Sequence, residues 1–345
     1  MRHLLFYNWF QSVRNTFPHL HKPPQQYLGL LTLGLLRSQN FALTKQALSL
    51  SEYGHPATVH KRLKRAVQHP AFTQLTNFSA LTRLVLEQVR PQQVVLVIDE
   101  TTLRDHVRVL MIGLAYKKRC LPLAWMCSDG KWQASQVERI ETLLTAIAVG
   151  LPSSYTPVIL ADRGIGTSPA LMRLIQQFGW HFLLRVTDSA KFYTQQRWTS
   201  LAQLARPQQT RRFSGCLFKK RGRISAVTLW LVWKAPFPKP QCLACNSPSL
   251  RPRLYQQRFW IEATFKDWKS RGFRWEDSRL WSATRTSAIL LALALAYLFS
   301  ARCSARLSPS ARRVYAWAAP LSWFQLALRL FLAHPFLYFP KTVPP

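Results

Sequence analysis

The stretch from residue 90 to residue 188 alternates short apolar runs with amphipathic segments, and this pattern restricts the fold more than any other feature of the chain. The runs "QQVVLVIDETTL" and "RVLMIGLAYKKRCLPLAWMCS" predict three strands in an antiparallel meander, with a turn between Tyr116 and Arg119. An amphipathic helix, the strand "YTPVILADRGIG", a second helix and the strand "WHFLLRVTD" follow. This order predicts an α/β domain rather than an all-helical or all-β protein.

The segments before and after this α/β part have different sequence patterns. We expect residues 1–88 to form a helical DNA-binding region, because one basic run there suits contact with a DNA backbone or groove, although a solvated charged face is the alternative. That run contains His60, Lys61, Arg62, Lys64 and Arg65. Residues 89–300 are expected to form a catalytic domain of the ribonuclease H type. It carries a mostly β insertion at about 189–250 that ends in a proline-rich connector. Residues 301–345 are expected to be a helical C-terminal segment, a candidate for dimerisation.

The charge balance points to a polyanionic partner. The chain has 47 Lys plus Arg against 14 Asp plus Glu, a formal net charge of +33. Nucleic acid is the first candidate, and an anionic membrane surface is the alternative. The most apolar segment, Ala288 to Phe299, is too short to span a bilayer and is expected to be a buried helix. We therefore expect a soluble, cytoplasmic protein with no membrane contact.

Cys242 and Cys245 form a CxxC pair. A zinc site would need two more ligands at suitable spacing, so ordinary reduced thiols are the simpler interpretation.

Two aspartates stand where predicted strands end. Asp99 closes the first strand run and Asp162 follows "VILA". A single acid at such a position commonly caps the next element, so each alone carries little weight. If the two strands are neighbours in one sheet, however, the carboxylates converge. Hard oxygen ligands at one point are what Mg²⁺ requires.

A third carboxylate, Glu262, lies in a predicted helix among cations. At ~100° per residue, one helical face roughly 80° wide holds it with four other side chains. These are Tyr255, Arg258, Lys266 and Lys269. One acid among bases suits a phosphate backbone lying across a metal ligand, whereas a solvated, salt-bridged helix is the alternative.

The spacing Tyr255-x2-Arg258-x3-Glu262-x6-Lys269 resembles the YREK signature of bacterial insertion-sequence transposases with a ribonuclease H-like DDE nuclease. The segments "VVLVIDETTL" and "VILADRGIGTS" are similar to the first-Asp and second-Asp strands of that family. The resemblance covers roughly residues 30 to 300.

The resemblance implies a catalytic triad, Asp99, Asp162 and Glu262, that holds two Mg²⁺ ions, with Mn²⁺ as a substitute. It also implies phosphate contacts by Tyr255, Arg258 and Lys269, next to which Lys266 lies on the same face. Relatives stack a flipped base on a tryptophan of the insertion; Trp230 matches that position and Trp233 competes with it. Glu100, directly after the first aspartate, departs from the pattern.

The expected function follows from this resemblance. A DDE transposase would cleave insertion-sequence ends and join the 3′-hydroxyl to target DNA by Mg²⁺-dependent phosphoryl transfer. Its partners would be double-stranded transposon ends and target DNA, bound by a homodimer at the bacterial nucleoid. A non-catalytic, sequence-specific DNA-binding protein and a Mg²⁺-dependent nuclease without strand transfer are the alternatives.

Overall fold

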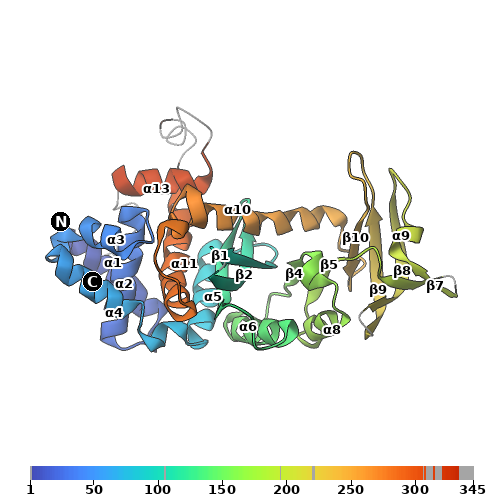
Figure 1. Cartoon of the computed structure of the whole chain (residues 1–345), viewed down its shortest axis with the longest axis horizontal. Helices are drawn as coiled ribbons and strands as arrows, with labels where there is room; N and C mark the ends of the chain where they lie inside the picture. The colour runs from blue at the N-terminus through green and yellow to red at the C-terminus, as the bar shows by residue number, and fades with distance from the viewer. Residues whose placement is uncertain are drawn as a thin grey trace.

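The β-branched run at Val95–Leu103 forms β1, the third strand from one edge of a single ten-stranded mixed sheet (Figure 1). This computed structural model describes residues 2–104, 106–194, 196–219, 222–305, 307, 314 and 321–333. The other strands are β2 (Val107–Tyr116), β3 (Arg119–Asp129), β4 (Val158–Ala161), β5 (His181–Val186), β6 (Lys191–Thr194), β7 (Arg197–Ser200), β8 (Thr210–Lys219), β9 (Gly222–Val232) and β10 (Gln241–Cys245). Their order in the sheet is β3-β2-β1-β4-β5-β10-β9-β8-β6-β7.

The α/β pattern predicted for residues 90–188 is present. Strands β1, β2 and β3 form an antiparallel meander, and β4 and β5 then add in parallel on the other side of β1. Helix α6 (Gln136–Gly150) separates β3 from β4, and α7 (Arg163–Gly166) and α8 (Pro169–Gln177) separate β4 from β5. Helix α6 begins at a capping box in which Ser135 and Glu138 satisfy each other's backbone amides. The observed order therefore matches the order expected from the sequence.

Helices dominate the N-terminal part of the chain. They are α1 (Arg2–Thr16), α2 (Lys22–Ser38), α3 (Leu43–Ser49), α4 (Pro56–Ala66) and α5 (Thr76–Val89), with 3₁₀ turns at Ser51–Tyr53 and Pro70–Thr73. These helices pack against α11 (Ala283–Ala305) from the far end of the chain. Trp9 meets Phe299 edge-on at 4.4 Å, and Phe41 stacks on Trp275 at 5.7 Å. The two segments therefore share one hydrophobic core.

Helix α11 is longer than its most apolar stretch. By length and composition it could cross a membrane, but 89% of its apolar window is buried inside the protein. It lies between the N-terminal helices and the sheet (Figure 1). Its burial is that of a core helix. Helix α13 (Trp323–Ala333) packs on it, whereas most of the segment 301–345 expected to mediate dimerisation lies outside the described residues.

The β insertion extends the same sheet. Strands β6 to β9 and the four-residue helix α9 (Leu201–Leu204) lie beyond β5, at the end of the molecule opposite the N-terminal helices (Figure 1). The proline-rich connector contains a strand that the sequence did not predict, because β10 pairs with β5 and β9 and joins the insertion to the core sheet.

The CxxC pair lies on β10 and is buried. Residues three apart in a strand face opposite sides, so the thiols of Cys242 and Cys245 cannot share an ion. Burial raises the pKa of both thiols, to about 12 for Cys242 and about 11 for Cys245. These are the properties of structural, protonated thiols.

The contact between α5 and α6 gives a test of this packing. A Cβ added at Gly150 would lie 2.2 Å from the carbonyl oxygen of Ser79, which is backbone and cannot move aside. We expect Gly150→Ala to lower the free energy of unfolding by about 1–3 kcal/mol. Gly29→Ala is the matched control, since its Cβ would meet Trp9 at an ordinary 3.4 Å, and it should be neutral or stabilising by up to ~1 kcal/mol. Urea unfolding followed by circular dichroism measures both, and equal midpoints would contradict the close approach of α5 to α6.

Candidate active site

Asp99 and Asp162 lie side by side at one edge of the parallel pairing. Strands β1 and β4 pair from Val95 and Val158 up to Ile98 and Ala161, and the next residue in each chain segment is the aspartate. The prediction that β1 ends at Asp99 was wrong, because the strand continues to Leu103 through its pairing with β2. The end of the β4 pairing, rather than the end of the strand, brings the two acids together.

Local backbone contacts orient both side chains. Asp162 caps α7, since its Oδ1 accepts hydrogen bonds from the amides of Gly164 (2.9 Å) and Ile165 (3.1 Å). The Oδ1 of Asp99 accepts from the amide of Glu100 at 2.9 Å. Each carboxylate keeps its other oxygen, Oδ2, for partners outside its own segment.

Arg258 is that common partner. Its Nη2 lies 3.1 Å from Oδ2 of Asp99 and 3.8 Å from Oδ2 of Asp162, while its Nη1 pairs with Oε1 of Glu262. The arginine is 8% exposed, whereas the carboxylate of Glu262 is 45% exposed. One guanidinium therefore gathers three carboxylates from three separate elements.

Burial and charge act in opposite directions at Asp99. Burial raises the pKa of its carboxyl group to about 6, and the two neighbouring carboxylates add to this rise. The Arg258 guanidinium and the amide of Glu100 lower the pKa and only partly offset burial. The positive charge of Arg258 therefore does not cancel the effect of burial, although the carboxyl group remains mostly deprotonated at neutral pH.

The segment that carries Arg258 and Glu262 is helical but irregular. It begins as the 3₁₀ helix η3 (Pro252–Phe259), continues as α10 (Trp260–Lys266) and ends in the π-helical turn η4 (Asp267–Arg271). The prediction of one regular helical face was therefore wrong. Lys266 is exposed and Lys269 half-buried, and neither side chain forms an ion pair with a described residue.

Tyr255 anchors the start of this segment. Its ring is 2% exposed, and its hydroxyl donates to the carbonyl oxygen of Ala161, the residue before Asp162, at 3.2 Å. The tyrosine thus ties η3 to the end of β4. This contact is internal, and the phosphate contacts expected of Tyr255, Arg258, Lys266 and Lys269 stay predictions.

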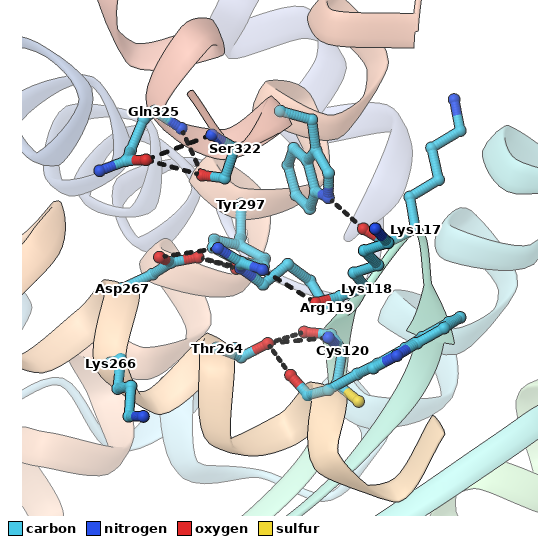
Figure 2. Close-up of polar contacts among 12 residues, drawn as sticks. Lys117, Lys118, Arg119, Cys120, Thr264, Lys266, Asp267, Tyr297, Ser322 and Gln325 are labelled. Atoms are coloured by element: carbon cyan, nitrogen blue, oxygen red, sulfur yellow. Dashed lines mark hydrogen bonds and ion pairs between the residues drawn. The ribbon is translucent and has the colours of Figure 1, made fainter. Parts of the chain in front are cut away.

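Two polar contacts fasten the far end of the segment to the start of β3 (Figure 2). The hydroxyl of Thr264 accepts from the amide of Cys120 at 2.8 Å. Asp267, which is fully buried, meets Nε of Arg119 at 2.5 Å and the hydroxyl of Tyr297 on α11 at 2.8 Å. Sequence reasoning missed these residues, because a lone Asp267 between Lys266 and Trp268 carries no signal of its buried partners.

A known family matches the part of the chain that contains this site. The model of the family described as "Transposase DDE domain" matches residues 90–299, well over half of the chain. The chain belongs to the transposase DDE domain family. Family membership makes the protein a transposase and implies dependence on divalent metal.

Two further comparisons say less about the family of this chain. The comparison with curated proteins gives no match. Among solved structures, a cryo-EM structure of the piggyBac transposase synaptic complex with hairpin DNA is similar to this chain. The two are 14% identical with a TM-score of 0.46, and the alignment covers 94% of this chain and 78% of that chain.

Glu100 does not belong to the carboxylate group of this transposase. Side chains alternate along a strand, so it faces away from Asp99, toward α6. There its carboxylate accepts from the indole of Trp132 at 3.1 Å and pairs with Arg139 (3.6 Å) and Arg108 (3.7 Å). The departure from the family pattern is thus accommodated on the opposite face of the sheet.

Trp230 is already engaged by other side chains. Its indole donates to the carbonyl oxygen of Leu250 at 3.1 Å, and the guanidiniums of Arg212 and Arg251 lie over its ring at 5.4 and 5.5 Å. Its expected role in stacking a base stays a prediction.

Beside Tyr255 lies a cavity of about 530 Å³ with a basic and aromatic lining. That lining includes Arg185, Lys234, Phe237, Lys239, Arg253 and Phe259.

The buried pair behind the active-site segment gives a test of the scaffold. We expect Arg119→Met to lower the free energy of unfolding by about 3–5 kcal/mol, because it leaves the buried carboxylate of Asp267 uncompensated. Arg274→Met is the control: its pair with Asp277 is 65% and 50% exposed and should contribute under ~1 kcal/mol. Chemical denaturation of both variants measures the difference. An equal loss of unfolding free energy in the two variants would show that the Arg119–Asp267 pair does not stabilise this segment.

Proposed function

We propose that this transposase cleaves the ends of an insertion sequence and joins the freed 3′-hydroxyl to target DNA by Mg²⁺-dependent phosphoryl transfer. The observation that carries the proposal is the convergence of three carboxylates, Asp99, Asp162 and Glu262, on one guanidinium at an edge of the parallel strands. The YREK spacing supports placement in the bacterial insertion-sequence group, and with it a cytoplasmic, nucleoid-associated protein.

The donor set fits a divalent ion in its chemistry. All three side chains supply hard carboxylate oxygens, which Mg²⁺ prefers and Mn²⁺ accepts, and they already pair with one cationic group, the guanidinium of Arg258. In the present arrangement that guanidinium lies among the carboxylates, and no three described His, Cys, Asp or Glu side chains are close enough to share an ion. Asp99, Asp162 and Glu262 would hold the metal once Arg258 turns away from them. Two bound ions would activate the attacking oxygen and stabilise the leaving one.

The positive charge around the site would hold the DNA. Glu262 is the most exposed of the three carboxylates, so the substrate would reach the metal from the Glu262 side of the site. Exposed Lys266 and half-buried Lys269 follow on the same segment and are free of ion pairs among the described residues. Arg258 turned out of the carboxylate group would add a further phosphate contact, and Trp230 on the insertion would stack a base.

The N-terminal helices would supply a second DNA contact. Helix α4 buries Val59 and Leu63 and leaves Lys61, Lys64 and Arg65 exposed, so its cations form an outward face. Next to it lies a cavity of about 630 Å³ whose lining includes Lys64, Arg279 and Arg285. We assign residues 1–88 to recognition of double-stranded transposon ends and residues 89–300 to catalysis, with a homodimer bringing two ends together.

Cleavage of the element's own end is the first test. We expect purified protein to nick a labelled end duplex with Mg²⁺ or Mn²⁺ but not with EDTA, and Glu262→Gln to abolish nicking while retaining DNA binding. Glu100→Gln is the matched control, since its carboxylate lies on the opposite face of the sheet and should leave nicking intact. Joining of the nicked strand to a target plasmid separates a transposase from a nuclease. Tight binding without metal-dependent nicking would contradict the proposal and leave a DNA-binding protein.

Removal of the internal cation is the second test. Without metal, Arg258→Gln leaves three carboxylates close together, and we expect a lower melting temperature. Added Mg²⁺ or Mn²⁺ should then stabilise this variant more than the wild type, because the ion no longer competes with a guanidinium. Lys266 pairs with no carboxylate among the described residues, so Lys266→Gln should respond as the wild type does. Thermal unfolding across a metal titration measures both, and an equal gain in all three proteins would contradict a metal site among these carboxylates.

A further inference from the structure

We propose that the outer face of the strands β6 to β9 binds unpaired DNA. Three large aromatic side chains are exposed there, Tyr193 by 41%, Trp198 by 38% and Phe218 by 36%. They stand on the three strands β6, β7 and β8 at the end of the sheet farthest from the N-terminal helices (Figure 1). This face lies apart from the carboxylate group, and its binding does not depend on cleavage.

The strand register places the three rings on one side of the sheet. Tyr193 pairs with Trp198 across β6 and β7, and their ring centroids are 5.2 Å apart. Phe218 pairs with Lys191, two residues from Tyr193 and therefore on the same side, and its ring lies 5.9 Å from that of Trp198. The intervening positions point to the other side and are fully buried, as Phe192 and Leu217 show. The sheet thus has its hydrophobic core on one face and an aromatic row on the other.

Cations border this aromatic row. The guanidinium of Arg223, which pairs with Phe218 across β8 and β9, lies 5.4 Å from the centre of the Trp198 ring. Lys191, two residues from Tyr193 and on the same side of β6, is exposed as well. Moreover, the sequence between Asp188 and Glu262 contains no aspartate or glutamate at all. A surface so depleted of acids attracts a polyanion along its whole length.

The rings identify which polyanion suits the face. A duplex hides the faces of its bases, so cations alone would serve to bind its phosphates. Unpaired bases expose π faces that stack on aromatic side chains at ~1–3 kcal/mol per base, while the neighbouring cations follow the backbone. A second copy of this chain is a poor occupant, because two acid-free cationic faces repel each other. The combination of exposed rings and cations therefore favours a single strand.

The experiment compares affinities of the full-length protein for a labelled oligothymidylate of about 12 nucleotides and for a duplex of the same length. We expect Trp198→Ala and Tyr193→Ala each to weaken single-strand binding by roughly ten-fold and to leave duplex binding within about two-fold. Trp198→Phe, which keeps an aromatic face, should bind nearly as the wild type does. Trp281→Ala is the matched control, since that indole is 49% exposed but stacks on His106 away from the insertion.

Three results would overturn the proposal. Unchanged single-strand affinity in Trp198→Ala and Tyr193→Ala would show that the rings do not contact bases. An equal loss of affinity for duplex and single strand would show that the face contacts only the phosphate backbone. A change of molar mass in light scattering for these variants, with no change in DNA affinity, would assign the face to contact between copies of the chain. Each result leaves the metal-dependent cleavage assay untouched, so the two proposals fail or stand separately.

Discussion

The contact of Arg258 with three carboxylates is the interaction on which the catalytic half of the chain depends. Neighbouring carboxylates repel one another, most of all at Asp99, whose side chain is largely buried, and the guanidinium of Arg258 offsets that repulsion by pairing with Asp99, Asp162 and Glu262. That charge comes from the same helical segment as Glu262, four residues earlier. When this segment packs on the sheet, it therefore places both the third acid and the compensating cation.

Anchors at both ends hold the segment where that compensation works. Tyr255 fastens its start to the end of β4, and Asp267 fastens its end to Arg119 and to Tyr297 of α11. Between the anchors the helix changes from 3₁₀ to α to π form, and π-helical turns occur often at functional sites. Because α11 also packs against α2, the helix that anchors the end of this segment contacts the N-terminal helices as well.

The sequence supported the prediction of those features that depend on local pattern. The meander, the β4 strand and the proximity of Asp99 to Asp162 follow from apolar runs and strand order, which local propensity and short connections determine. Strand β10 could not be predicted, because its five residues lie between prolines and gain their stability from β5 and β9. The carboxylate partners of Arg258 were equally hidden, since a basic residue in a signature motif suggests a phosphate until tertiary structure supplies a nearer anion.

The few acids of the chain explain how its surface stays so positive. Several of them have partners within the protein: Asp267 pairs with Arg119, Glu100 pairs with Arg139, and Glu138, at the surface, caps α6. Acids used in this way neutralise internal cations and helix ends, so few acids remain to compensate the exposed lysines and arginines. The insertion carries this distribution furthest, because it contains no acid and keeps its hydrophobic face internal. The same scarcity of acids that makes the triad conspicuous therefore also leaves an unopposed positive surface for DNA.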